Sequence, residues 1–370
     1  MRRTSGHLSD GREIIYFDHD DSPPRGAVDQ RGLPVGSTEQ GSMRWDALTG
    51  EWISIAGHRQ TRIFLPDAAA CPLCATTPGN LSEIPESSYD VAVFENRFPS
   101  FMGLPPDQGT HLAEKPHRLD GTNTAPAYGR CEVVAFTPDH SGSIAALSPA
   151  DMSLVLDAWI DRTRELSALP GIRYVFPFEN RGAEVGVTLH HPHGQIYAYP
   201  FVPPAMQRIL ERAGAEASSG HRLLADMVAR ELADGLRVIY ADNHWVAFVP
   251  FAARWPFEVH IHPIADRGDL TELTDGERRS FAESYPRLIR ALDQIFNAPL
   301  PYMAGWHQRP AHPTAEETRD ARLFLRLISN RRAADKLKFL AGSESLMGAF
   351  IGDVAPEDAA AGIRAAWESR

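Results

Sequence analysis

Phe178-Glu-Asn-Arg-Gly-Ala-Glu-Val-Gly-Val-Thr-Leu-His-His-Pro-His-Gly-Gln195 is the stretch that decides the fold and the chemistry of this chain. At its core, His191 and His193 flank a proline and are followed by Gly194 and Gln195. Histidine can act as nucleophile, proton carrier or metal ligand near neutral pH. The proline restricts the backbone between the two rings, and we expect Gly194 to let a bulky group approach the main chain. Gln195 supplies an amide donor for a developing oxyanion. The run therefore predicts a reactive site.

The same stretch resembles the active-site signature of the galactose-1-phosphate uridylyltransferases, a family of the histidine-triad superfamily. That signature reads Phe-Glu-Asn, Arg or Lys, Gly, three residues, Gly, four residues, His-Pro-His, one residue and Gln, and every fixed position is met here. The resemblance extends from Arg44 to Pro356. It implies an α+β protein with a duplicated histidine-triad-like fold, in which antiparallel sheets form a half-barrel flanked by helices.

The order of predicted elements also indicates a duplication. Ser148, followed by a proline and an acidic residue, is a typical helix N-cap, and Thr274 begins a second helix in the same way. The segment 245–250 echoes 133–138, which gives a period of about 112 residues. We predict a mobile leader at 1–43 with one short strand at 13–17, a catalytic half at 44–204, and a catalytically degenerate half at 205–370. In the second half, the segment 323–328 takes the place of the His-Pro-His region.

Bulk composition excludes several functional classes. The net charge of −11 argues against binding to nucleic acid or to an anionic membrane. No apolar run reaches the 18 or more residues of a membrane span, and the first residues lack the apolar core of a secretory signal. Three cysteines do not make a secreted disulfide framework. We therefore expect a cytoplasmic protein.

His193 is the predicted nucleophile, because a neutral imidazole can attack the α-phosphorus of a nucleotide sugar and form a nucleotidyl-histidine. Its other ring nitrogen then needs a fixed acceptor, for which the resemblance implies the backbone carbonyl of His191. Gln195 would stabilise a phosphoryl oxygen during transfer. The resemblance further implies substrate contacts around the phosphates, the sugar and the nucleoside from Asn180, Gly186, Thr188, Asn96 and Phe98. We read Glu179 and Glu184 as structural residues.

Two further segments resemble sugar-phosphate binding segments of the family. Arg59 and Arg62 can clamp phosphate oxygens, and this segment reaches the neighbouring subunit in the family. Lys338, Phe339 and Glu344 match the segment that contacts the hexose. The resemblance thus implies a homodimer with shared active sites.

Cys71 and Cys74 form a thiolate pair of the zinc-binding type. The resemblance implies that His140 and His191 complete a closed, structural zinc site that orients His193. Two alternatives are a pair of buried free thiols and a site that uses His190 in place of His191. The resemblance also includes members with a second metal bound by one Glu and three His; we predict none here.

Only His307 survives among those second-site ligands, since Ile209, Phe324 and Arg326 occupy the other positions. His260 and His262 alternate on a predicted strand and share one face. Without a nearby third ligand, we interpret them as structural residues.

The predicted function is transfer of UMP from UDP-glucose to galactose 1-phosphate through a covalent histidine intermediate, with ping-pong kinetics. A related phosphorylase, for instance one acting on ADP-glucose and phosphate, is the alternative, because Phe350 stands where several uridylyltransferases carry a hexose-contacting glutamine. An inactive nucleotide-binding protein and a histidine-triad hydrolase are less favoured. Intact His193 and Gln195 argue against the first, and the glutamine in place of a third histidine argues against the second.

Overall fold

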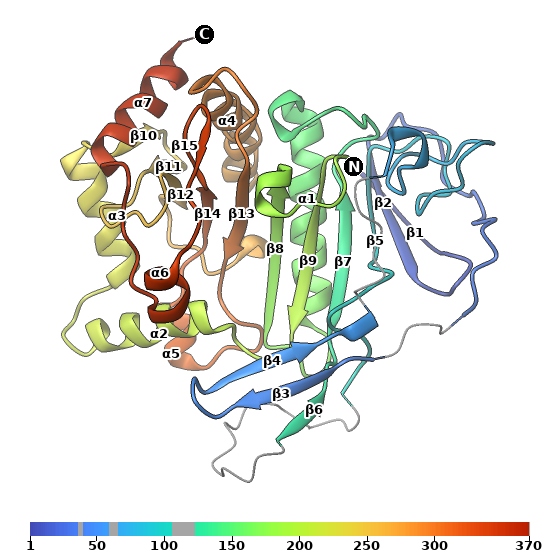
Figure 1. Cartoon of the computed structure of the whole chain (residues 1–370), viewed down its shortest axis with the longest axis horizontal. Coiled ribbons are helices and arrows are strands. Elements are labelled where there is room, and N and C mark those ends of the chain that lie inside the picture. The colour runs from blue at the N-terminus through green and yellow to red at the C-terminus, as the bar shows by residue number, and fades with distance from the viewer. Residues whose placement is uncertain (36–39, 59–65, 106–122, 370) are drawn as a thin grey trace.

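A computed structural model describes residues 1–35, 40–58, 66–105 and 123–369 of the chain. Its centre is an open, 11-stranded sheet in which every paired strand is antiparallel to its neighbour. The strand order is β1-β2-β5-β7-β9-β8-β13-β14-β12-β11-β10. The expected α+β class with antiparallel sheets is confirmed, and the sheet does not close into a barrel (Figure 1).

The first half of the sheet carries the signature. Its strands are β1 (Arg2–His7), β2 (Glu13–Asp18), β5 (Val91–Glu95), β7 (Arg130–Ala135), β8 (Tyr174–Arg181) and β9 (His193–Tyr199). Helix α1 (Pro149–Ser167) connects β7 to β8 and begins at Ser148, whose hydroxyl accepts a hydrogen bond from the amide of Asp151 at 3.1 Å. The predicted cap and helix start are therefore confirmed.

The second half repeats the arrangement with β10 (Val238–Ala241), β11 (Trp245–Phe248), β12 (Phe257–Pro263), β13 (Tyr302–His307) and β14 (Phe324–Ser329). Helix α4 (Asp275–Gln294) connects β12 to β13 as α1 connects β7 to β8, and Thr274 closes a capping box at its start. From edge to centre, β10-β11-β12-β14-β13 mirrors β2-β5-β7-β9-β8. The duplication is thus visible in the topology.

The predicted repeat period of about 112 residues is wrong, because it pairs strands of the two halves that are displaced by one position in the sheet. It aligns β7 with β11, whereas the sheet order places β11 opposite β5 and β12 opposite β7. Short apolar strands resemble one another closely, so local similarity alone chose the wrong partner. The correspondence of the segment 323–328 with the His-Pro-His region holds, because β14 occupies the place of β9.

The short strand predicted at 13–17 is confirmed as β2 (Glu13–Asp18), whereas the expectation of a mobile leader around it is wrong, because β1 also forms. β1 and β2 pair along their full lengths, and β2 pairs with β5, so the N-terminal segment extends the central sheet. Ile15 and Phe17 of β2 are at most 1% exposed and belong to the main core. Burial of these apolar side chains offsets the entropy lost on ordering the segment.

One face of the sheet is covered by the long helices α1 and α4 (Figure 1). Along β9, Ile196 and Ala198 are fully buried and belong to the core that includes α1. Successive side chains of a strand point to opposite faces, so His193, Gln195 and Tyr197 lie on the other face. The pleat of β9 therefore separates the packing residues of the signature from its polar residues.

Smaller elements surround the sheet. A three-stranded sheet has the order β4-β3-β6, and a two-stranded ribbon joins β15 to β16. None of the described helices is both long and apolar enough to cross a lipid bilayer. The remaining elements are β3 (Ser42–Asp46), β4 (Glu51–Ile55), β6 (Thr124–Pro126), β15 (Arg331–Ala333), β16 (Lys336–Leu337), α2 (Pro204–Ala217), α3 (Leu223–Asp234), α5 (Ala315–Asp320), α6 (Gly342–Met347), α7 (Pro356–Glu368) and the short 3-10 helices η2 (Ala68–Ala70), η3 (Ile144–Ala146), η4 (Ala183–Val185) and η5 (Leu270–Glu272).

Candidate active site and metal-binding cluster

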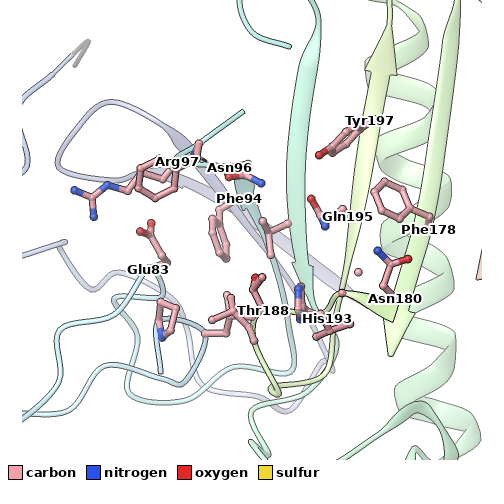
Figure 2. Close-up of a pocket in the computed structure, with 18 residues that line it drawn as sticks. Glu83, Phe94, Asn96, Arg97, Phe178, Asn180, Thr188, His193, Gln195 and Tyr197 are labelled. Atoms are coloured by element: carbon pink, nitrogen blue, oxygen red, sulfur yellow. Dashed lines mark hydrogen bonds between the residues drawn. The ribbon is translucent and has the colours of Figure 1, made fainter. Parts of the chain in front are cut away.

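A cavity of about 270 Å³ opens on the sheet face opposite α1 (Figure 2). Strands β5, β7, β8 and β9 form its floor, and the loops before β5 and β9 form its walls. Of the residues predicted to bind substrate or react, seven line it: Asn96, Phe98, Asn180, Gly186, Thr188, His193 and Gln195. Segments separated by about 100 residues in sequence thus meet in one cavity, as antiparallel pairing permits.

His193 begins β9 and is oriented by its own backbone. Its Nδ1 lies 2.8 Å from the carbonyl oxygen of His191, which is the acceptor that we expected. A proton on Nδ1 that is donated to this carbonyl fixes the neutral tautomer and leaves a lone pair on Nε2. Since His193 lines the cavity, that nitrogen is suited to attack a bound phosphorus centre.

Gln195 follows two residues along β9 and lines the same cavity (Figure 2). Its side-chain oxygen is buried and has no hydrogen-bond partner among the described residues. A buried polar group without a partner is unfavourable unless a ligand completes it. The oxygen of the carboxamide can therefore accept a hydrogen bond from a bound substrate.

Gly194 has a packing role in addition to the one we expected. A Cβ at this position would lie 2.6 Å from the ring of Phe136 and 2.7 Å from the carbonyl oxygen of Phe178. These contacts leave no room for a side chain on the helix side of β9. The glycine thus allows close packing of the strand, in addition to lining the cavity.

The loop between β8 and β9 forms a wall of the cavity. Gly186 ends its short helical turn with a φ of 83°, a left-handed conformation that favours glycine. Asn180, on β8, and Thr188, on this loop, line the cavity.

Glu179 is 5% exposed and accepts a hydrogen bond from the Tyr302 hydroxyl at 2.8 Å. Glu184 pairs with Arg331 at 2.9 Å. Neither glutamate lines the cavity, in agreement with their structural interpretation.

The predicted metal ligands converge. One ligand atom from each of Cys71, Cys74, His140 and His191 lies within 4.8 Å of the others. Cys74 Sγ is 3.5 Å from His140 Nδ1 and 3.5 Å from His191 Nδ1. A tetrahedron with Zn–S bonds of about 2.3 Å and Zn–N bonds of about 2.0 Å separates sulfur from nitrogen by about 3.5 Å. The donor set and its spacing therefore fit a closed metal site. His190 is exposed and outside the cluster, so it does not replace His191.

Two pKa shifts in the cluster bear on how it would hold a cation. Burial and the neighbouring Cys71 raise the pKa of the Cys74 thiol to about 12. A cation between the two sulfurs would reverse this effect, because metal coordination stabilises the thiolates. Burial lowers the pKa of His191 to about 4, which keeps the ring neutral, as a metal ligand must be.

Two residues that we did not predict orient His191. The carbonyl oxygen of Thr137 lies 2.8 Å from its Nε2, and the Tyr89 hydroxyl lies 3.0 Å from the same atom. Donation from Nε2 to the carbonyl leaves Nδ1 directed at the cluster, as partners outside the ligand shell commonly do for metal-bound histidines. The tyrosine also donates to the Leu73 carbonyl, between the two cysteines, at 2.8 Å. No spacing in the sequence links these residues.

Five predicted residues are not placed in this cavity. Arg59 and Arg62 lie outside the described residues. Within the described chain, Lys338, Phe339 and Glu344 line no part of the cavity. Lys338 is buried and pairs with Asp353 at 2.9 Å, whereas Phe339 is 73% exposed.

The second half has apolar and paired side chains where the second metal site of some relatives is expected. Phe324 stacks on His307 with ring centroids 4.5 Å apart, and Arg326 pairs with Glu258 at 2.8 Å. Ile209 packs in an apolar cluster. His262 is fully buried between Phe248 and Phe324. His260 Nε2 lies 3.1 Å from Glu258. These contacts are aromatic stacking, apolar packing and ion pairs.

Several cavity residues were not predicted from sequence. Tyr197 follows Gln195 at the two-residue spacing of a strand face, and Phe94 precedes Asn96 in the same way, so strand periodicity signals both. Arg97 lies between two predicted residues. Glu83 has no such signal and reaches the cavity only through the path of the loop before β5.

Comparison with known proteins agrees with this geometry. Residues 37–203 match the family model described as galactose-1-phosphate uridyl transferase, N-terminal domain, and residues 210–368 match the C-terminal domain. The galactose-1-phosphate uridylyltransferase of Streptomyces lividans is 44% identical over 84% of this chain and 81% of its own. The galactose-1-phosphate uridylyltransferase of Thermotoga maritima is 36% identical over 87% of this chain and 97% of its own.

Solved structures give the same result. One described as a uridylyltransferase superposes with a TM-score of 0.75 at 34% identity and covers 88% of this chain and 98% of its own. An Arabidopsis thaliana ADP-glucose phosphorylase shares the fold, with a TM-score of 0.65 and 24% identity. The match covers 88% of this chain and 98% of the phosphorylase. With both halves matched and the reactive residues gathered in one cavity, this chain belongs to the galactose-1-phosphate uridylyltransferase family.

Proposed function

We propose that this protein is a nucleotidyltransferase that moves UMP from UDP-glucose to galactose 1-phosphate, as in galactose metabolism by the Leloir pathway. The observation that carries the proposal is the orientation of His193, whose Nδ1 lies 2.8 Å from the His191 carbonyl while the ring lines the cavity. Nucleophile, carboxamide and nucleoside-sized cavity lie together in a family whose members bear this activity in their names.

The reaction follows as two displacements. His193 Nε2 attacks the α-phosphorus of UDP-glucose, the bond to the bridging oxygen breaks, and glucose 1-phosphate leaves. A phosphate oxygen of galactose 1-phosphate then attacks the uridylyl-histidine, which releases UDP-galactose and restores the neutral ring. Gln195 donates to a nonbridging oxygen in both steps. The covalent intermediate divides one difficult displacement into two easier ones.

The metal cluster supports this chemistry indirectly. We propose that Cys71, Cys74, His140 and His191 hold one zinc ion, since two sulfurs and two ring nitrogens complete a tetrahedral shell with no open position. When bound, the ion stabilises the loop that carries His191. His191 in turn offers its carbonyl to His193, so the metal site and the nucleophile share one residue.

The remaining assignments are also proposals. Asn180, Gly186 and Thr188 contact the phosphates and sugar, and Asn96 and Phe98 hold the nucleoside, because all five line the cavity around His193. Arg59 and Arg62 bind the hexose phosphate. The three described cysteines form no disulfide with one another, which suits a reducing compartment such as the cytoplasm.

We further propose a homodimer in which the segment 338–344 of one subunit completes the cavity of its partner. In a single chain this segment lies over the second half, away from the cavity lining (Figure 1). The segment and the residues after it expose large apolar side chains, with Phe339 73%, Leu346 77% and Met347 78% exposed. Exposed apolar groups of this kind commonly mark an interface.

Incubation with UDP-glucose labelled at the α-phosphorus tests the proposed function. We expect acid-labile label on the wild-type chain and none on His193→Ala. His190→Ala is the matched control, because this neighbouring histidine is exposed and lines no part of the cavity. Galactose 1-phosphate should discharge the label. The proposal would be contradicted if galactose 1-phosphate left the label in place and inorganic phosphate removed it. Full labelling of His193→Ala would also contradict it.

A further inference from the structure

Glu83 places a carboxylate on the cavity wall. It lines the cavity together with Phe94, Asn96 and Arg97, and it is 8% exposed. Figure 2 shows its carboxylate beyond Phe94, on the side of the cavity opposite His193 and Gln195. Its backbone amide donates to the Pro72 carbonyl at 2.9 Å, which ties it to the loop of the metal ligands.

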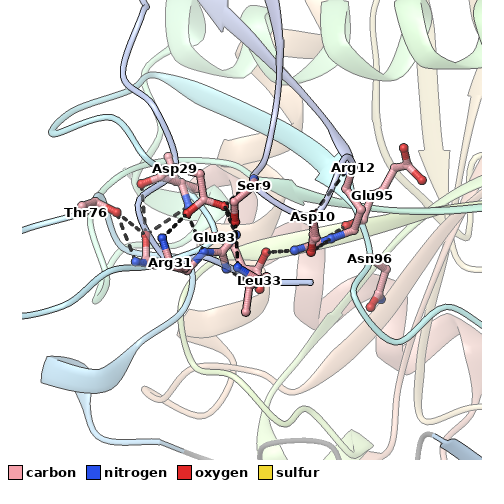
Figure 3. Close-up of polar contacts among 12 residues, drawn as sticks. Ser9, Asp10, Arg12, Asp29, Arg31, Leu33, Thr76, Glu83, Glu95 and Asn96 are labelled. Carbon is pink, nitrogen blue, oxygen red and sulfur yellow. Dashed lines mark hydrogen bonds and ion pairs between the residues drawn. The ribbon is translucent and has the colours of Figure 1, made fainter. Parts of the chain in front are cut away.

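Two arginines of the N-terminal segment hold this carboxylate (Figure 3). Arg12 Nη2 lies 2.6 Å from one Glu83 oxygen and Arg31 Nη1 lies 2.8 Å from the other. Each arginine is fixed in turn, Arg12 by Asp10 at 2.8 Å and Arg31 by two bonds to Asp29 at 2.8 and 2.9 Å. A network of ion pairs with each partner held restricts the carboxylate to one orientation.

The supporting arginines lie at positions 12 and 31, before the first residue matched by the N-terminal family model, residue 37. The N-terminal segment is fastened to the sheet by β1 and β2. Arg12 also donates to the Glu95 carbonyl at 2.7 Å, next to Asn96. The orientation of a cavity residue therefore depends on a segment outside the matched domains.

The carboxylate has hydrogen-bonding capacity left for a ligand. An ionised carboxylate offers about four lone-pair positions and only accepts hydrogen bonds, and the two arginines use one oxygen each. It repels phosphate, which agrees with its position across the cavity from His193. The nucleoside end of a nucleotide carries two adjacent hydroxyl donors on the ribose, and these match a carboxylate that accepts from two groups.

We propose that Glu83, oriented by Arg12 and Arg31, accepts hydrogen bonds from the ribose hydroxyls of the bound nucleotide and selects ribonucleotides over deoxyribonucleotides. The inference rests on the proposed function only in placing a nucleotide in this cavity. Arg12 and Arg31 are positioning residues, because they act through Glu83.

Equilibrium binding tests the inference without requiring transfer. Titration calorimetry gives the Kd of UMP, 2′-deoxy-UMP and 3′-deoxy-UMP for each variant. We expect the wild type to bind UMP about tenfold or more tightly than either deoxy analogue, since a hydrogen bond to a charged acceptor is lost. In Glu83→Gln, UMP loses two hydrogen bonds to a charged acceptor whereas each analogue loses one, so the Kd of UMP should rise by the larger factor and the preference for UMP should fall.

Arg12→Ala and Arg31→Ala should reduce the ratio of the Kd of each deoxy analogue to the Kd of UMP, as Glu83→Gln does. Arg3→Ala is the matched control, because the described ion pairs of Arg3 join the same N-terminal segment to Asp161 and Glu165 of α1 rather than to Glu83. A preference that survives in Glu83→Gln would overturn the inference. Equal weakening of all three ligands would also overturn it and would indicate a contact with the base.

The two proposals fail in different ways. Normal labelling of His193 without a ribose preference in the wild type overturns the ribose contact alone. A ribose preference that depends on Glu83, without labelling, overturns the transfer reaction alone. If UMP does not bind, the ribose contact is wrong, and the labelling of His193 decides the transfer reaction by itself.

Discussion

At the scale of single residues, the pleat of two strands divides the signature into reactive and structural positions. Asn180 faces the cavity, whereas its neighbour Glu179 is buried on the helix side against Tyr302. Burial raises the pKa of Glu179 to about 7, despite the hydrogen bond from Tyr302. An acid in this setting is held in its neutral form in the folded protein at mildly acidic pH.

Glu179→Gln should therefore change how stability depends on pH. The folded-state pKa is raised above the ordinary value of 4.5, so this group's contribution to stability is fully present below about pH 4.5 and is lost as pH rises through about 7. The glutamine variant, which cannot ionise at this position, should not lose stability in this way as pH rises. Relative to the variant, the wild-type free energy of unfolding should fall by at most roughly 3 kcal/mol over that range.

Denaturant titrations at several pH values between 4.5 and 8 measure this difference. Glu184→Gln, in the same signature but on the exposed loop with Arg331, should follow the wild-type pH profile. If Glu179→Gln and wild type show parallel profiles, Glu179 is not the group that titrates.

At the scale of elements, the start of β9 joins the metal cluster to the nucleophile. His191 directs its side chain to the cluster and its carbonyl to His193. Phe136 and Gly194 pack the same strand end against the helix side. The position of the reactive ring thus depends on the cluster, although no cluster atom is needed for the displacement itself.

Removal of the metal should therefore loosen this strand end. We expect about one zinc per chain by elemental analysis, and its loss on chelation or in Cys74→Ser should lower both Tm and the rate of His193 labelling. Cys131→Ser is the matched control, because Cys131 is also buried but lies outside the cluster. A chelated protein that keeps its Tm and labelling rate would show that the cluster is not a metal site of this kind.

At the scale of the whole molecule, the two halves share one sheet but not one chemistry. β14 occupies the place of β9, and Phe324 and Arg326 stand where a reactive strand would need ligands or a nucleophile. The exposed apolar segment after β16 is the feature of this second half that points beyond the single chain. In the proposed homodimer, this segment acts at the partner's cavity.

Subunit mixing tests this assignment. His193→Ala lacks the nucleophile, and Phe339→Ala should lower kcat/KM for galactose 1-phosphate about tenfold without disturbing the fold, because Phe339 is 73% exposed. In a mixed dimer, one site combines an intact His193 with an intact Phe339 from the partner. Random exchange should restore about a quarter of the wild-type activity. Activity no higher than the average of the two variants would assign Phe339 to its own chain or to neither site.

The sequence by itself determined the parts of this protein that depend on local spacing. The caps at Ser148 and Thr274, the reactive strand and the Cys71–Cys74 pair were predicted because capping and ligand motifs have short, characteristic patterns. His140 and His191 were added to that pair only through the family resemblance. The tertiary structure alone decided the rest. The first two strands joined the sheet because their burial depends on β5, which follows them by more than 70 residues.

Dependence on distant parts of the chain also explains why the repeat was aligned with the wrong strand and why the position of Glu83 in the cavity was not predicted. Its contact with Arg12 and Arg31 joins parts of the chain that are distant in sequence, and no periodicity records which charged side chains will meet across such a distance. Pairing of this kind is set by the register of the sheet and the path of its loops, which are properties of the folded chain.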